Sequence, residues 1–377
     1  MIYPANWEKV TCHDWYNDEK KIWLCLENKN AICEIDKNSK NVKILGSFPH
    51  NGLGDADLSL SLIRCGDYIV FCPFKANDIA VLNICTGVLE FINLLEILEQ
   101  NGHLCDGIEK FYRMALYKHY VFFFGIKYPA IMRLDLTTNR IDLFDEWMDQ
   151  IEQNRCKDAV LFTDGYAQKE DEIYLPIGRC NGVLKINLNT MKGKYIEIKA
   201  ITHGILGMTQ RENHVWITEY DIGAEKFFHW NLDDDEIIPI DLPCHDAFYA
   251  PVYSDNSLLF FQNARNKSYR YDLLSGCWTD ITSMLPDLVN SSDKIVRGDV
   301  VNYFANESKR FYHCDLKRNL VYFDELQINE KDFLNDSWED YCRYYMQELK
   351  DHAVVENKLK LRDFIGIIRT IKNSKCC

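Results

Sequence analysis

Residues 269–278 read YRYDLLSGCW, and this stretch carries the pattern that decides the fold. An aromatic run ends at Asp272, a short polar turn follows, and Trp278 begins a second run. An Asp side chain at such a place accepts hydrogen bonds from backbone amides just after it, and it tolerates the dihedral angles of a tight turn. The stretch therefore predicts two antiparallel strands joined by a hairpin that Asp272 anchors.

The same strand–turn–strand unit recurs along the chain, and its anchor is always Asp or Asn. The seven anchors are Asp36, Asn83, Asp135, Asn187, Asn231, Asp272 and Asp315. The intervals between them are 47, 52, 52, 44, 41 and 43 residues, which is the range expected for propeller blades. A β-sandwich with long insertions, the alternative, would not repeat one turn so evenly.

Hydrophobic runs around each anchor give four antiparallel strands per unit, here named a to d in chain order. Sheets of this kind bury their faces by stacking radially and closing into a ring. The fold class predicted is therefore all-β, a seven-bladed β-propeller of four-stranded antiparallel blades over residues 1–330.

The copy with Tyr271, Asp272 and Trp278 resembles the kelch repeat, whose blades carry a Tyr-Asp pair and a Trp a few residues later. The resemblance concerns blade design over residues 10–326. The paired glycines typical of a kelch second strand are absent, and the other copies keep only the Asx turn. Kelch-type propellers include interaction modules and oxidases, so the resemblance implies a fold and leaves the function open.

From residue 331 to residue 377 the apolar residues follow helical spacing instead, as Phe333, Leu334, Trp338 and Tyr341 illustrate. We expect a helical C-terminal extension. It either packs on the propeller or serves as a docking element for a partner.

Net charge, hydrophobic segments and cysteine content indicate which partners and which location to expect. The 377 residues carry a net charge of −14, which argues against nucleic acid as a partner because such binding depends on neutralising phosphates. The sequence shows no secretory signal and no apolar stretch long enough to span a membrane, so no membrane partner is expected. With 15 cysteines and no signal peptide, a reducing cytoplasmic location is favoured over a disulfide framework.

Strand order places the b–c and d–a loops on one face of the propeller and the short Asx turns on the other. The d–a loops are long and varied, for instance residues 46–58, 95–109, 145–157 and 282–294. Variable loops on a rigid scaffold commonly carry binding sites. We therefore expect the functional face to be the one with the b–c and d–a loops.

The b–c turns on that face carry a cation in six of the seven blades. This pattern predicts a ring that attracts an anionic small molecule or an acidic peptide. The alternative is that hairpin turns simply favour long polar residues and that lysine protects sheet edges. The ligand-binding candidates are Lys75, Lys127, Tyr128, Arg179, Tyr220 and Arg265.

Three histidines near the starts of a strands, His13, His203 and His245, are the catalytic candidates. Asp14 follows His13 and Asp246 follows His245, but adjacent residues in a strand point to opposite sides. No Cys-x-x-Cys, His-x-His or His-Glu-x-x-His motif and no glycine-rich phosphate loop occurs, so we expect no metal site and no cofactor.

Two functions remain open, and a third is weaker. The first is a cytoplasmic binding or scaffold module that recognises a protein, a peptide or an anionic ligand on the b–c/d–a face. The alternative is a propeller enzyme, a lyase or hydrolase acting on a glycan or glycoconjugate with axial histidines and acids. The third is a metal-dependent enzyme in which His13, His203 and His245 converge.

Overall fold

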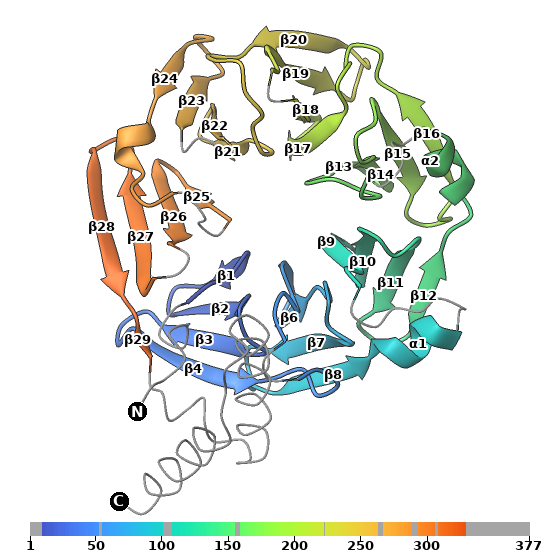
Figure 1. The fold of residues 1–377 in the computed structure, drawn as a ribbon, viewed down its shortest axis with the longest axis vertical. Coiled ribbons are helices and arrows are strands. Elements are labelled where there is room, and N and C mark those ends of the chain that lie inside the picture. The colour runs from blue at the N-terminus through green and yellow to red at the C-terminus, as the bar shows by residue number, and fades with distance from the viewer. Residues whose placement is uncertain are drawn as a thin grey trace, which may run out of the picture.

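The computed structural model describes residues 10–52, 55–100, 108–154, 159–221, 223–262, 267–288, 293–305 and 308–328. Within them the chain forms seven antiparallel sheets around a central axis, as Figure 1 shows. The prediction of an all-β, seven-bladed propeller is confirmed. The expected helical extension, residues 331–377, lies outside the described residues.

Each sheet is one blade, and four of its strands run outward from the axis in chain order; the first sheet has a fifth strand at its outer edge. The inner strands are β1 (Trp15–Asn17), β5 (Leu62–Cys65), β9 (Phe111–Tyr117), β13 (Ala167–Lys169), β17 (Ile205–Arg211), β21 (Val252–Ser254) and β25 (Ile295–Arg297). The second strands are β2 (Lys21–Cys25), β6 (Tyr68–Phe71), β10 (Tyr120–Gly125), β14 (Glu172–Pro176), β18 (His214–Glu219), β22 (Ser257–Phe261) and β26 (Val300–Phe304).

The third strands are β3 (Ile32–Asp36), β7 (Asp78–Asn83), β11 (Ile131–Asp135), β15 (Gly182–Asn187), β19 (Lys226–Asn231), β23 (Ser268–Asp272) and β27 (Arg310–Asp315). The outer strands are β4 (Asn41–Gly46), β8 (Leu89–Asn93), β12 (Ile141–Phe144), β16 (Gly193–Glu197), β20 (Ile237–Asp241), β24 (Trp278–Asp280) and β28 (Leu320–Glu325). These four groups correspond to the predicted strands a, b, c and d.

All seven predicted Asx turns form. In the sixth blade, Asp272 Oδ1 accepts hydrogen bonds from the backbone amides of Leu274 at 3.1 Å and Ser275 at 2.8 Å. The other six anchors make the same kind of bond to the residues after them. Because these bonds involve only neighbouring residues, the turn chemistry was readable from the sequence.

The core lies between neighbouring blades, where the second and third strands are buried on both faces. In β22 all five residues are buried, whereas every residue of β24 in the same blade is partly or fully exposed. Burial on both faces explains why the second strands are unbroken apolar runs rather than alternating ones. Flat rings fill the space between blades, as with Phe227 and Phe260, whose centroids lie 4.9 Å apart.

The ring closes between blades one and seven. Trp15 of the first blade packs edge-on against Phe304 and Phe311 of the last, with ring centroids 5.6 and 5.0 Å away. After β28 the chain adds a short strand, β29 (Gln327–Ile328), which pairs in parallel with β4. Lys40 reinforces this junction through an ion pair with Asp324 at 2.6 Å.

Two short helices interrupt the d–a connections that the sequence analysis treated as loops. They are α1 (Leu94–Gln100) and α2 (Met148–Asn154). Leu94, Leu98 and Ile151 are buried in the cores between the blades, so each helix caps the outer end of a core. Among the described residues, no helix is both long and apolar enough to cross a membrane.

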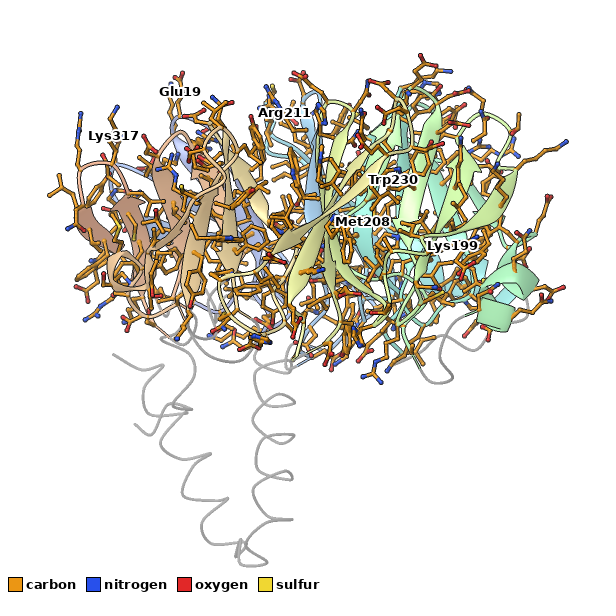
Figure 2. The ribbon with its side chains drawn as sticks, turned by 90° about the horizontal axis from the view of Figure 1, so that it is seen from above. Glu19, Lys199, Met208, Arg211, Trp230 and Lys317 are labelled. Carbon is orange, nitrogen blue, oxygen red and sulfur yellow. The ribbon has the colours of Figure 1, made fainter. Side chains whose placement is uncertain are left out.

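The two faces of the disc differ as predicted from strand order. Figure 2 shows Glu19 and Lys317, which lie in an a–b and a c–d turn, and Arg211, which ends β17, along one face. Lys199, from a d–a connection, lies away from that face. The inner strands begin at the d–a loops, so residues at their first positions face the end of the axis that carries the long loops.

Candidate functional site

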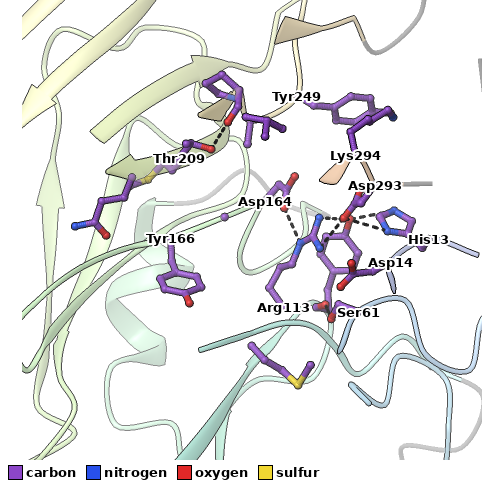
Figure 3. A pocket seen from close by; sticks show the side chains of 18 of the residues that line it. His13, Asp14, Ser61, Arg113, Asp164, Tyr166, Thr209, Tyr249, Asp293 and Lys294 are labelled. Carbon is purple, nitrogen blue, oxygen red and sulfur yellow. Dashed lines mark hydrogen bonds and ion pairs between the residues drawn. The ribbon is translucent and has the colours of Figure 1, made fainter. Parts of the chain in front are cut away.

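A cavity of about 550 Å³ lies on the central axis, at the end where the inner strands begin. It therefore opens on the face of the b–c and d–a loops, where the sequence analysis expected function. Every blade contributes to its wall, and Figure 3 shows the side chains from several of them. Representatives of blades one to seven are His13, Ser61, Arg113, Asp164, Thr209, Tyr249 and Asp293.

Arg113, the third residue of β9, is the central cation of this axial pocket. Its Nε lies 2.6 Å from Asp164 Oδ1, and its Nη1 lies 2.9 Å from Asp293 Oδ2. Burial disfavours the guanidinium charge, but the attraction of Asp164, and also of Asp293, outweighs burial and raises the pKa of Arg113. The guanidinium thus stays charged and holds carboxylates from two other blades in place.

The imidazole of His13 lies beside this cluster. Its Nε2 is 3.2 Å from the hydroxyl of Tyr112, and its Nδ1 is 3.7 Å from Asp293 Oδ2. Burial lowers the pKa of His13 and outweighs the attraction of Asp293, which acts in the opposite direction. At neutral pH the ring is therefore uncharged and able to accept a proton.

The carboxyl group of Asp14 has the opposite character. Its two oxygens accept hydrogen bonds from the backbone amides of Trp15 at 2.7 Å and Leu62 at 3.0 Å. Burial, and then the negative charge of Asp293, raise its pKa to about 7. Asp14 therefore retains its proton in part of the molecules at neutral pH, and it can donate that proton.

His13 and Asp14 line the same cavity, which corrects an expectation from the sequence. Strand alternation predicts that neighbours point to opposite sides, but both residues precede β1, which begins at Trp15. The alternation rule does not apply before the strand starts. The pair is thus a joint feature of the pocket.

The electrostatics of the pocket suit proton transfer. Asp293 is a half-buried carboxylate: burial would raise its pKa, but the positive charge of Arg113 outweighs burial and lowers it. Asp14 is a carboxyl whose pKa is raised. Two carboxyl groups whose pKa values are shifted in opposite directions can take different roles, one staying ionised and the other donating a proton.

The three histidine candidates do not meet. His13 lines the axial pocket, and His203 lines a second cavity, with its Nε2 3.6 Å from Asp221 Oδ2. His245 is on the surface, 71% exposed, with its Nδ1 3.4 Å from Glu225 Oε1. In the part of the chain that the structure describes, no three or more His, Cys, Asp or Glu side chains are grouped to hold a metal ion. His13, His203 and His245 therefore lie at three separate places and do not surround one ion.

Two of the hairpin cations pair with carboxylates from the d–a loops. Lys75 Nζ lies 2.7 Å from Asp57 Oδ2, and Lys127 Nζ lies 2.8 Å from Glu109 Oε2. These carboxylates offset the positive charge that the sequence pattern places on this face. Ligand binding by the lysines stays a prediction.

Two further candidates differ in their surroundings. Tyr128 is only 1% exposed, and its ring packs 5.5 Å from that of Phe111, centroid to centroid. Arg265 lies outside the described residues. Tyr128 therefore contributes to the core between blades, and a ligand role for it would require the ring to move.

The structure does bring Arg179, Tyr220 and His203 together. They line a second cavity of about 570 Å³ between blades four and five on the same face. The Arg179 guanidinium carbon lies 4.8 Å from the centre of the Tyr220 ring, and its Nη2 donates a hydrogen bond to the Tyr220 hydroxyl at 3.3 Å. Arg179 has a φ of 50°, a left-handed conformation that a non-glycine residue seldom adopts.

The sequence reasoning missed the central groups of the axial pocket, Tyr112, Arg113, Asp164, Asp293 and Lys294. Each lies at or just before the start of an inner strand. The inner strands vary from three residues, as in β1, β13, β21 and β25, to seven in β9 and β17, so their starts are hard to align by eye. Aligning the seven units on the starts of the inner strands, rather than on the Asx turns, would have shown that polar residues recur there.

No family model matches the chain, and no curated protein sequence matches it either. Solved structures do resemble it. Virginiamycin B lyase from Staphylococcus aureus is 15% identical over 82% of this chain and 93% of its own, with a TM-score of 0.59. A streptogramin B lyase is 16% identical over 86% and 96%, with a TM-score of 0.60.

A chain in the mitotic checkpoint complex is 10% identical over 81% of this chain and 86% of its own, with a TM-score of 0.55. At such identities the likeness concerns the fold alone. The neighbours include a lyase as well as a member of a protein assembly. The function must therefore be argued from the pocket.

Proposed function

We propose that the chain is a propeller enzyme, a lyase or hydrolase that acts by proton transfer in the axial pocket on a small polar substrate such as a glycan or glycoconjugate. One observation carries the proposal: His13, Tyr112, Arg113 and Asp293 form a connected cluster in the wall of that pocket. A mouth filled by apolar side chains would instead have suited a pure binding module.

His13 is the proposed proton acceptor. Its neutral ring has one nitrogen 3.2 Å from the Tyr112 hydroxyl and the other 3.7 Å from the Asp293 carboxylate. A carboxylate on one side of an imidazole stabilises the charge that appears when the ring takes up a proton. Asp293 is thus a positioning residue, held by Arg113, and the substrate would approach from the cavity.

Asp14 is the proposed proton donor. Its pKa of about 7 matches the condition for an efficient acid at neutral pH, which must hold a proton and still release it. Having an acid and a base in one cavity is what elimination and hydrolysis both require, since one proton leaves the substrate and another reaches the leaving group.

The test is a turnover screen read by mass spectrometry. The panel holds neutral and uronic-acid oligosaccharides, aryl glycosides and, because of the fold likeness, virginiamycin B. For any substrate that wild-type protein converts, we expect His13→Gln to lower kcat about 100-fold or more, the usual contribution of a general base. Asp14→Asn should have a comparable effect and should remove the alkaline limb of the pH profile of kcat/KM.

The matched control is His245→Gln, since His245 is 71% exposed and lies outside the axial pocket. It should leave turnover unchanged. Turnover that survives in the His13→Gln/Asp14→Asn double variant would contradict the proposal, as would a panel that binds in the pocket without conversion.

The second candidate is a binding module, and the cavity with Arg179, Tyr220 and His203 favours it. An exposed guanidinium stacked on a tyrosine ring offers both charge and a flat surface to a carboxylate or phosphate. Inorganic phosphate and an acidic peptide are suitable probes for titration calorimetry. Arg179→Glu should abolish binding, while Lys127→Glu should leave it intact.

Three finer expectations join this proposal. We propose a kelch-like blade design, supported by Tyr271 and Trp278, whose ring centroids lie 4.8 Å apart. Buried thiols that form no disulfide, such as Cys25, Cys33 and Cys72, support a reducing compartment such as the cytoplasm. Partner docking through residues 331–377 remains a proposal from the sequence.

A further inference from the structure

Lys294 is a cation of the axial pocket that the proton-transfer scheme does not use. It follows Asp293, directly before β25, and lines the cavity. Among the described residues its ammonium group makes no hydrogen bond and no ion pair. Figure 3 accordingly draws dashed lines from Asp293 to Arg113 and His13 but none to Lys294.

Lys294 forms no ion pair with the carboxylate of its neighbour Asp293, which contacts two other side chains. Asp293 Oδ2 lies 2.9 Å from Arg113 Nη1 and 3.7 Å from His13 Nδ1. Lys294 Nζ instead lies 5.4 Å from the centre of the Phe261 ring. This lysine thus differs from Lys75 and Lys127 on the same face, each of which contacts a carboxylate directly.

Burial favours the neutral form of this amine. It lowers the pKa of Lys294, and the attraction of Asp293 only partly opposes the effect. An amine whose pKa is lowered by burial has a larger fraction in the neutral, nucleophilic state than an exposed lysine, and this effect of burial opposes the attraction of the Phe261 ring face for the ammonium. The groups needed to move protons during attack, His13 and Asp14, line the same cavity.

We propose that Lys294 is a nucleophile that forms an imine with a carbonyl group of the substrate. The substrate class is then an aldehyde, a ketone or a sugar in its open-chain form. This inference rests on the proposed function, because it concerns the same pocket, and it narrows the activity to a lyase. An iminium nitrogen withdraws electrons and so assists cleavage of a bond one carbon away.

The step balances as follows. The lone pair of neutral Nζ attacks the carbonyl carbon, a C–N bond forms, and the π electrons of C=O move to oxygen, which takes a proton from the Asp14 carboxyl. The nitrogen then loses a proton to His13. The hydroxyl leaves as water after taking up that proton, and the nitrogen lone pair forms the C=N bond. The products are a protonated imine and one water, with no oxidant or reductant consumed.

The experiment is reductive trapping on the whole chain. Wild-type protein is incubated with glycolaldehyde and sodium cyanoborohydride at neutral pH, which converts an imine into a stable secondary amine, and peptide mapping locates the label. We expect Lys294 to react about tenfold faster than any other lysine, because its amine is deprotonated more often. The preference should disappear in urea, where burial is lost.

Two variants complete the test. Lys294→Arg keeps the charge but cannot form the imine, so the fast label should vanish while the slow labelling of other lysines continues. Lys75→Arg is the matched control, since Lys75 is paired with Asp57; it should leave the Lys294 label unchanged. Labelling of Lys294 at the rate of exposed lysines in folded wild-type protein would overturn the inference.

The experiments distinguish a failure of the imine proposal from a failure of the proposed proton-transfer function. If His13→Gln stops turnover while wild-type Lys294 is not labelled preferentially, proton transfer stands and the imine is excluded. If Lys294 is labelled rapidly but His13→Gln and Asp14→Asn leave turnover unchanged, the assignment of Lys294 as a nucleophile is supported. The assignment of His13 and Asp14 as proton acceptor and donor is then contradicted.

Discussion

The Nε atom of Arg113 lies 2.6 Å from Oδ1 of Asp164, and this contact joins the inner strand of blade three to the segment that leads into blade four. The same guanidinium reaches Asp293 before blade seven at 2.9 Å. One side chain thus holds together segments from three blades at the axis. The arrangement is at once a structural junction and the electrostatic centre of the proposed active site.

Removing that cation should destabilise the protein. Arg113→Met leaves Asp164 and Asp293, whose side chains are 23% and 35% exposed, without their counter-ion. Because solvent partly screens them, we expect a cost of about 2–3 kcal/mol, below the range for a fully buried pair. Urea unfolding followed by tryptophan fluorescence measures the change. Arg140→Met is the control, because Arg140 pairs with Asp142 but is 74% exposed, and it should change stability by less than about 0.5 kcal/mol. Equal effects of the two variants would contradict the central role of Arg113.

Asp14 should make stability depend on pH. Its pKa is about 7 in the folded protein against an ordinary value of 3.8, so between these values the folded state binds a proton that the unfolded state has released. Its stabilising contribution is complete at pH below 3.8 and is lost as pH rises through about 7. Across that window, we expect wild type to lose about 2–4 kcal/mol relative to Asp14→Asn.

The comparison of the two curves isolates Asp14 from other titrating groups. Asn also loses one of the two hydrogen bonds from Trp15 and Leu62, because only one of its terminal atoms accepts. That loss adds an offset independent of pH. Parallel stability curves for wild type and Asp14→Asn would show that Asp14 titrates normally.

Gly165 should be intolerant of any side chain. It lies in the pocket wall with a φ of 76°, and a β-carbon there would overlap the carbonyl oxygen of Met208 in the next blade. Gly87 has a similar φ of 74° but nothing near it. We expect Gly87→Ala to cost about 1 kcal/mol from backbone strain alone and Gly165→Ala about 3 kcal/mol or more. Thermal unfolding of both variants measures the difference; similar losses would mean that the blades adjust without cost.

Ring closure should be sensitive to Leu326. This residue is 2% exposed in the core between blades seven and one, just before β29. Leu326→Ala should cost about 2–5 kcal/mol, the usual range for a buried leucine, measured by urea unfolding. Leu274→Ala is the control, since Leu274 is 83% exposed. A small effect at Leu326 would show that the β29 junction does not limit stability.

The sequence by itself determined the repeat. Each Asx anchor bonds to amides only two or three residues away, so Asp36 or Asp272 specifies its hairpin whatever the rest of the chain does. Seven such hairpins, each with continuous apolar strands, can bury their faces only by stacking into a ring. Strand order then fixed which loops share a face, and the axial pocket lies at that face.

Only the tertiary structure decided the site. Arg113 and Asp164 are separated by 51 residues, Asp293 lies further along still, and nothing local links the three. They meet because ring closure brings the starts of the inner strands to one axis, where side chains from all blades converge. Folding of single blades gave Lys75 and Lys127 carboxylate partners from the d–a loops, whereas Lys294 has none among the described residues. Pairing of charges depends on distances that a sequence pattern does not contain, and so does the burial that shifts the pKa values of His13 and Asp14.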